Sequence, residues 1–397
     1  MENKTEAKTS GFIQMSLATL QAINRMDGGY NELAAYIVLC GGVNGRHAGR
    51  YCTHGAKSVS DRSGMSYRTA EKAIDWLHEH GLIRPPSETE PQFLGKTATR
   101  AHTVRWVLGD SEALDVAVSR QFVDGVKGSQ KDSPLKRMLA EIGGKDDITR
   151  GQAVSDAIVL FAALMKEQDF AECAGVDPDA WHSEFVPVTE KDVLDDSEHI
   201  VPVPNTNAVM VTVKESADNF STLPFVYKVF DEKPEDEQRK KELTNRFWHG
   251  VHQLRSLRLI YRVLILWQGN PLDAKQRRKV EPIATHYIND SWAREIDPHL
   301  QYEVNRAAWR SGAKDAYADF SASARAGGEF GDGYLPFLKT GAYRYMVNTK
   351  SANSTHLVGQ LRVRYWAANE STVQGRQIEK NRTEKFASAI KQIARPF

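Results

Sequence analysis

Residues 66–69, with the sequence Ser-Tyr-Arg-Thr, place four consecutive hydrogen-bonding side chains at the start of a predicted helix. The guanidinium of Arg68 is the group that makes bidentate hydrogen bonds to the edge of a guanine. Thr69 and Lys72, in the same part of the helix, are suited to contacts with phosphate oxygens. This set of groups therefore points to recognition of nucleic acid.

The elements that position these side chains follow from caps and apolar spacing. A helix is predicted from about Tyr67 to His80, because its apolar residues recur at helical spacing. Gly64 is expected to end a short polar helix over Ser58–Ser63, and Ser66 to cap the next one. An earlier helix over Asn31–Cys40 and later strands complete the order helix, helix, glycine turn, helix, strand, loop, strand. The later strands are expected at Leu82–Ile83 and His102–Leu108.

This segment resembles the winged helix-turn-helix family. The resemblance is carried by Ser58–Ala70, with the sequence SVSDRSGMSYRTA, and by Leu77–Ile83, with the sequence LHEHGLI. It covers residues 31–108, a fifth of the chain, and is specific for the fold rather than for the biological role. Many bacterial regulators share the pattern, as do the N-terminal domains of phage and plasmid replication proteins.

The resemblance implies that the helix starting at Ser66 enters the major groove of double-stranded DNA. Arg68 is then the best candidate for reading a base, and the wing supplies basic contacts to the backbone or the minor groove. The DNA contacts expected in this module are Ser58, Ser66, Tyr67, Arg68, Thr69, Lys72, Lys96 and Arg100. The alternative is that the same fold serves only as a protein-contact module.

A second segment, residues 242–260, echoes residues 68–83 at a fixed offset of 177. Apolar residues coincide at Ala70 and Phe247, Ile74 and Val251, Leu77 and Leu254, Leu82 and Leu259, and Ile83 and Ile260. We therefore expect a second winged-helix-like domain with Gln152–Lys166 as its first helix. Two strand-like runs, Ala208–Val213 and Phe225–Phe230, would be an insertion in it. The DNA contacts expected here are Arg246 and the wing residues Lys275, Arg277, Arg278 and Lys279.

The predicted fold class is α+β and mainly helical. Residues 11–110 are assigned to the DNA-binding domain, 111–150 to a linker, 151–300 to the second domain and 301–397 to a basic helical region. The last region contains a run, Leu361–Trp366, typical of an edge strand or short helix. It ends in a basic amphipathic helix, Glu379–Ala394, for which a partner subunit, the DNA backbone and its own domain remain alternative binding surfaces.

Other chemistry finds little support in the residue patterns. The sequence Gly143-Gly144-Lys145 lacks the glycine spacing and the hydroxyl residue of a nucleotide-binding loop. His78 and His80 lie at a helix end, and with Cys52 and His54 they form a weak candidate for zinc. His252–Arg255 matches one fragment of the tyrosine recombinase signature, but a strand is predicted directly after it. No cofactor, metal or catalytic residue is expected.

Bulk properties are those of a globular protein, with 41% hydrophobic residues and a formal net charge of +1. Three cysteines, an odd and sparse set, favour a reducing cytoplasm over a disulfide framework. Neither a secretory signal nor an apolar run of membrane-spanning length is recognised. We expect a cytoplasmic protein with no membrane partner.

The leading hypothesis is a sequence-specific binder of double-stranded DNA, of bacterial or mobile-element type, that regulates transcription without catalysis. The first alternative is a replication initiator of the plasmid or phage type, because tandem winged helices are similar to that class. The second is a DNA-processing enzyme such as a tyrosine recombinase. A homodimer or another protein partner is left open for the C-terminal helix.

Overall fold

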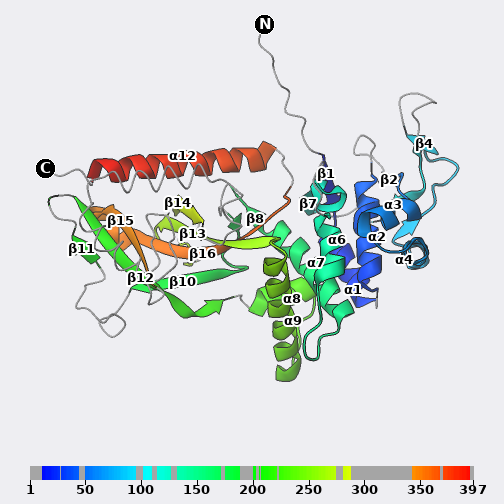
Figure 1. Cartoon of the computed structure of the whole chain (residues 1–397), viewed down its shortest axis with the longest axis horizontal. Coiled ribbons are helices and arrows are strands. Elements are labelled where there is room, and N and C mark those ends of the chain that lie inside the picture. The colour runs from blue at the N-terminus through cyan, green and yellow to red at the C-terminus, as the bar shows by residue number, and fades with distance from the viewer. Residues whose placement is uncertain are drawn as a thin grey trace, which may run out of the picture. The chain divides into compact units, whose positions relative to one another are not determined.

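The computed structural model describes residues 11–26, 28–43, 50–94, 102–109, 114–126, 132–170, 175–187, 200–202, 205, 207–220, 223–273, 280–287, 342–366 and 370–393. Helices and strands both contribute, as expected for an α+β protein (Figure 1). The chain forms two compact units. The first lies within residues 1–167, 223–260 and 363–369, and the second within 168–222, 261–362 and 370–397.

The first unit is mainly helical. Its helices are α1 (Leu17–Arg25), α2 (Tyr30–Gly41), α3 (Ala56–Ser63), α4 (Tyr67–Glu79), α5 (Gln121–Asp124), α6 (Pro134–Glu141), α7 (Arg150–Lys166), α8 (Leu223–Phe230) and α9 (Glu237–Ser256). Its strands are β1 (Phe12–Met15), β2 (Tyr51–Cys52), β3 (Ile83–Arg84), β4 (Phe93–Leu94), β5 (His102–Thr103), β6 (Trp106–Leu108) and β7 (Val116–Ser119). Two helices, α2 and α7, are buried along most of their length and form the centre of the unit.

A small three-stranded sheet follows α2 to α4 and has the order β2-β6-β3. β6 lies in the middle and pairs antiparallel with both neighbours, with Tyr51 opposite Val107 and Ile83 opposite Leu108. Between β3 and β6 the chain forms the β4–β5 pair, in which Phe93 lies opposite Thr103. This segment therefore runs helix, strand, helix, helix, strand, hairpin, strand.

The second unit is built on a seven-stranded sheet. Its main path is β11-β12-β10-β16-β13-β14, and β15 pairs with β12. The elements are β8 (Gln168–Asp169), β9 (Gly175–Val176), β10 (His182–Pro187), β11 (Ile200–Pro202), β12 (Ala208–Phe220), β13 (Ile260–Gln268), β14 (Glu281–Tyr287), β15 (Ala342–Asn348), the 3-10 helix η5 (Thr349–Ser354), β16 (Thr355–Val363) and α12 (Glu370–Ile393).

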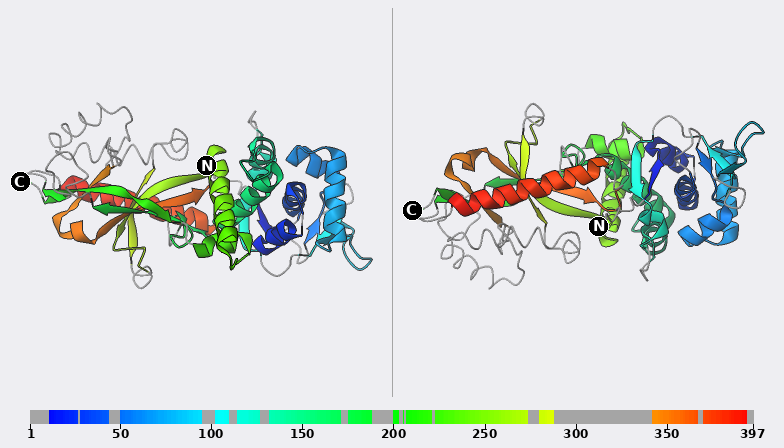
Figure 2. Two further views of the ribbon diagram at one scale, coloured as in Figure 1. Left: turned by 90° about the horizontal axis from the view of Figure 1, so that it is seen from below. Right: turned by 90° about the horizontal axis from the view of Figure 1, so that it is seen from above.

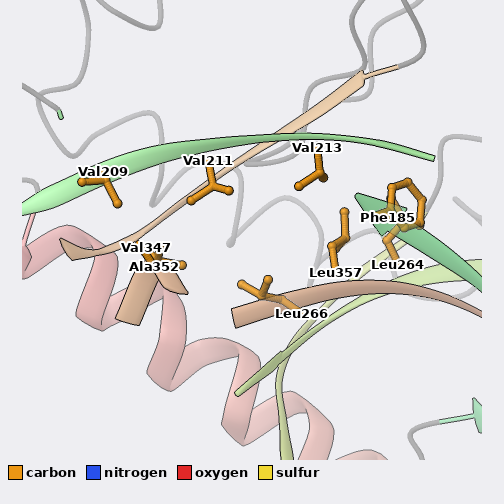
Figure 3. Close-up of a cluster of buried hydrophobic side chains, with 9 residues drawn as sticks. All are labelled: Phe185, Val209, Val211, Val213, Leu264, Leu266, Val347, Ala352 and Leu357. Carbon is orange, nitrogen blue, oxygen red and sulfur yellow. The ribbon is translucent and has the colours of Figure 1, made fainter. Parts of the chain in front are cut away.

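The sheet buries apolar side chains on both faces because β13 is apolar at successive positions. Leu264 and Leu266 point to one face, where they join valines of β12 and Leu357 of β16 (Figure 3). Val263 and Ile265 point to the other. The helix α12 runs along the sheet (Figures 1 and 2). It is joined to β16 by a buried ion pair.

This ion pair joins Arg362 to Glu379 with an Nη2–Oε1 distance of 2.6 Å. The side chains are 1% and 6% exposed, respectively. The guanidinium also lies over the ring of Phe170, 5.3 Å from its centroid. The buried pair therefore links α12 directly to β16.

Several sequence-based expectations need correction. Phe225–Phe230 is part of helix α8 rather than a strand, and residues 111–150 contain β7, α5 and α6 rather than a linker. Residues 301–397 are not a purely helical region, because they contain β15 and β16. Of the run Leu361–Trp366, residues 361–363 lie in β16, inside the sheet rather than at its edge, and the strand ends at Val363.

The second expected domain, residues 151–300, is also divided differently. Helices α7, α8 and α9 belong to the first unit, whereas β13 and β14 are strands of the sheet of the second. The chain leaves the first unit after Glu167 and returns to it at Leu223, so neither unit is continuous in sequence. Residues 301–341, the first part of the expected basic helical region, lie outside the described residues.

Candidate nucleic-acid interface

The turn between α3 and α4 is formed by a left-handed glycine and a capping serine. Gly64 has φ +80°, a left-handed conformation that glycine adopts at little energetic cost because it has no side chain. Its N–H donates a hydrogen bond to the carbonyl of Ser60 at 2.9 Å. Ser66 then accepts a hydrogen bond from the N–H of Thr69 at 3.1 Å. The expected glycine turn and the expected cap of α4 are both confirmed.

Helix α4 has one buried face and one polar face. The buried face consists of Ala70, Ala73, Ile74 and Leu77, as its spacing predicted. On the opposite face Tyr67 is 53% exposed, and Arg68, Glu71, Lys72 and Asp75 are exposed as well. The structure thus brings Ser66, Tyr67, Arg68 and Lys72 together at the start of one accessible helix. Ser58 is half-buried on the preceding helix α3, and Thr69 is half-buried on α4.

The cations of this face are free to meet an external anion. Within the described part of the chain, neither Arg68 nor Lys72 has an acidic partner. Glu71 instead accepts a hydrogen bond from the Tyr67 hydroxyl, which raises the pKa of Tyr67. An exposed, unpaired guanidinium at a helix start is the geometry that base-edge contacts require.

The segment after α4 begins with an ordered turn. Arg84 donates two hydrogen bonds of 2.6 Å to the carboxylate of Glu90, and these lower the pKa of Glu90 to about 2. The turn leads into β4, where Phe93 is 63% exposed while its neighbour Leu94 is buried. The two wing cations predicted from the sequence, Lys96 and Arg100, lie outside the described residues.

A groove of about 540 Å³ lies beside the first turn of α4. Ser66 and Thr69 line it together with Asn31 of α2 and Lys136 of α6. The Lys136 ammonium is 4.0 Å from Asp132, and the lysine side chain is 32% exposed. Sequence reasoning missed Lys136, because only the packing of α6 against α3 brings it next to this turn.

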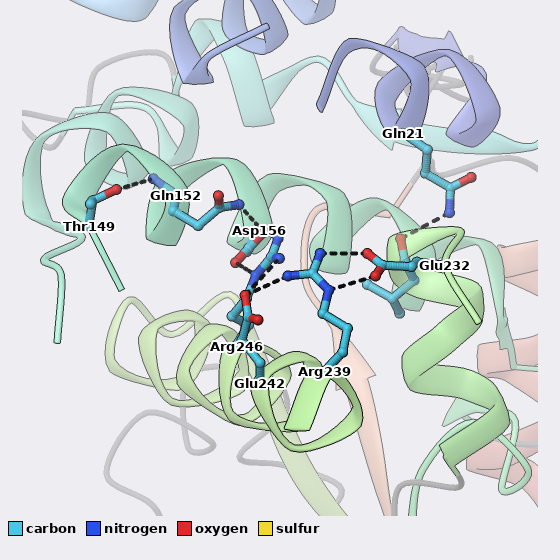
Figure 4. Close-up of polar contacts among 9 residues, drawn as sticks. Gln21, Thr149, Gln152, Asp156, Glu232, Arg239, Glu242 and Arg246 are labelled. Atoms are coloured by element: carbon cyan, nitrogen blue, oxygen red, sulfur yellow. Dashed lines mark hydrogen bonds and ion pairs between the residues drawn. The ribbon is translucent and has the colours of Figure 1, made fainter. Parts of the chain in front are cut away.

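Arg246, expected as a DNA contact of a second recognition helix, has a structural role instead. Its side chain is 11% exposed and binds Asp156, which is 2% exposed, with N–O distances of 2.7 and 2.9 Å (Figure 4). The guanidinium also lies over the Phe230 ring at 4.8 Å. The structure therefore corrects this expectation. The wing residues Lys275, Arg277, Arg278 and Lys279 lie outside the described residues.

The candidate metal ligands near α4 are engaged in other ways. The His80 ring stacks on Trp76 with centroids 3.9 Å apart, and His78 Nδ1 lies 3.1 Å from the carbonyl of Ile83. Burial raises the pKa of Cys52 to about 12, whereas zinc binds the thiolate. Among the described residues, no group of three or more His, Cys, Asp or Glu side chains could hold a metal ion.

Comparisons with known proteins add no information on function to this geometry. No family model, no curated protein and no solved structure matches the chain. Among the helices of the described residues, none combines the length and the apolar character needed to cross a bilayer.

The cap of α4 gives a first testable prediction. We expect Ser66→Ala to lower the free energy of unfolding of the first unit by about 0.5–2 kcal/mol, because the Thr69 N–H loses its partner. Ser66→Asp keeps an acceptor at the cap and should unfold like the wild type in urea. An equal loss of stability in both variants would contradict the capping role.

Proposed function

We propose that residues 30–109 form a winged helix-turn-helix that binds double-stranded DNA, with α4 in the major groove. The observation that carries the proposal is the capped start of α4, where Arg68 and Lys72 are exposed and have no acidic partner among the described residues. The order of helices and strands and the β2-β6-β3 sheet support it.

In this proposal Arg68 reads a base and the neighbouring groups position the helix on the backbone. Ser66, Tyr67, Thr69 and Lys72 surround Arg68 at the helix start, and Lys136 adds a cation beside them. The hydroxyls and ammonium groups would bind phosphates, which fix register without reading sequence. We propose that the chain is a sequence-specific regulator of transcription and that it acts by binding alone.

The experiment that tests this proposal starts from a duplex selected by the full chain from a random pool. We expect Arg68→Ala to weaken binding to that duplex by about fivefold to 150-fold, roughly 1–3 kcal/mol, because one bidentate base contact is lost. Fluorescence anisotropy at fixed salt measures the dissociation constant.

The matched control is Lys350→Ala, which removes one exposed cation from the second unit. It should bind the selected duplex as the wild type does. Equal dissociation constants for wild type and Arg68→Ala would rule out α4 as the reading helix, and failure of the wild-type chain to select any duplex would refute DNA binding.

A further inference from the structure

The end of α9 repeats the end of α4 in its backbone geometry. Leu82 donates its N–H to the carbonyl of Leu77 at 3.0 Å, and Leu259 donates to Leu254 at 2.8 Å. The residue before each leucine has a positive φ, 71° at Gly81 and 59° at Arg258. A strand starts directly afterwards in both cases, β3 and β13. These pairs all keep the offset of 177 residues.

The start of α9 also repeats the arrangement of α3 and α4. Helix α8 ends at Phe230, Asp231 takes a left-handed φ of 49°, and Asp236 caps α9 by accepting from the Arg239 N–H at 2.7 Å. Helix α7 packs against α8 and α9 as α2 packs against α3 and α4. The first unit therefore contains a second helix-turn-helix, with a longer turn and a longer third helix.

The buried face of α9 leaves its opposite face exposed. Leu243, Phe247, Gly250, Val251 and Leu254 are buried. Gly250 allows this close packing, since a Cβ there would lie 3.0 Å from a methyl carbon of Leu160. The outer face consists of exposed residues that recur every three or four positions along the helix. They are Lys241, Asn245, Trp248, His252 and Arg255.

The chemistry of this outer face suits a DNA duplex. In the described part of the chain Lys241 and Arg255 have no acidic partner, and they lie fourteen positions apart on the helix, which is about 21 Å. The major groove is about 12 Å wide, which is less than the separation of the two cations. A helix in the groove can therefore place one cation at the phosphates on each side. Between them, Asn245 and His252 provide hydrogen-bonding groups.

The groove beside α9 carries mixed charge. Its volume is about 1300 Å³, and it runs from α9 to the loop before α7, where Lys145 lies next to Asp146 and Asp147. Glu242 also lines it, but Arg239 binds that carboxylate at 2.6 Å. Four residues of the outer face, Lys241, Asn245, Trp248 and His252, line this groove as well, and among the described residues Lys241 is a cation of its lining that has no acidic partner.

We propose that the outer face of α9 is a second contact surface for double-stranded DNA, so that the first unit holds two segments of duplex. This inference rests on the proposed function of α4. It differs from the expectation based on Arg246, because the contacting residues lie on the opposite face of the helix.

The test compares two double variants on the selected duplex. Lys241→Ala with Arg255→Ala removes two cations that have no acidic partner among the described residues. Lys228→Ala with Lys240→Ala removes two cations that are paired with Glu167 and Glu237. We expect the first variant to shorten the footprint and to reduce the slope of log affinity against log salt by about two, because each phosphate contact contributes about one. The control should keep both.

The outcomes separate this inference from the function of α4. If the footprint and the salt slope stay unchanged in the Lys241 and Arg255 variant while Arg68→Ala still loses affinity, the outer face of α9 does not contact DNA, and the proposed role of α4 is kept. If the wild type binds no duplex, both are wrong.

A second readout does not depend on loss of function. A photoreactive benzophenone side chain in place of Trp248, in the otherwise unchanged full chain, should crosslink to the duplex. Crosslinking only to another protein chain, or none at all, would overturn the inference.

Discussion

Asp156→Ala is expected to destabilise the first unit by about 3–5 kcal/mol. The substitution removes the partner of a guanidinium that stays buried, and an unpaired buried charge carries a penalty of this size. The acidic side chain left to Arg246 among the described residues would be Glu242, 3.9 Å away and half-exposed. Gln152, whose amide nitrogen lies 2.8 Å from the same carboxylate, would lose its acceptor as well (Figure 4). Urea unfolding of wild type and variant measures the difference.

The control for this prediction replaces both partners. Asp156→Leu with Arg246→Leu leaves no buried charge, so it should recover most of the stability lost in Asp156→Ala. Glu242→Ala removes a half-exposed partner and should cost less than about 1 kcal/mol. A loss below that value in Asp156→Ala, or additive losses in the double variant, would contradict the role of this ion pair in joining α7 to α9.

Glu379→Ala should destabilise the second unit by about 3–5 kcal/mol. Glu379 is the acidic partner of Arg362, and both side chains are almost completely buried between α12 and β16. Loss of the carboxylate removes the 2.6 Å ion pair from a guanidinium that stays buried. We therefore expect α12 to lose protection against hydrogen exchange well before the sheet does.

The matched control lies on the same helix. Glu384 is 53% exposed and 4.0 Å from Lys380, so Glu384→Ala should leave stability and exchange nearly unchanged. If Glu379→Ala exchanged over residues 370–393 as slowly as the wild type, the buried pair would not be what holds α12 on its sheet.

The α3–α4 module was predictable because its determinants are local. Gly64 and Ser66 act on their own neighbours in the chain, and the apolar spacing of α4 decides which face is buried. The exposure of Arg68 follows from that spacing alone. The candidate site was therefore predicted in its helix but not in its surroundings, since Lys136 reaches it only through tertiary packing.

The errors arise where distant residues decide the structure. Phe225, Val226, Val229 and Phe230 are buried on one side of α8, although their β-branched and aromatic types favoured a strand. Arg246 looked like a free cation because its partner Asp156 lies 90 residues away in sequence. In the sheet of the second unit β10 pairs with β16, and these strands are so far apart in the sequence that no local pattern could predict their pairing.

The central claim is that α4 reads DNA through Arg68, and a double-mutant cycle measures this most directly. Dissociation constants are determined for wild type and Arg68→Ala, each on the selected duplex and on one in which the guanine facing α4 is 7-deazaguanine. Because the missing N7 and the missing guanidinium remove the same contact, we predict that the second change costs far less once the first is made. Additive losses, or no loss from either change, would contradict the account.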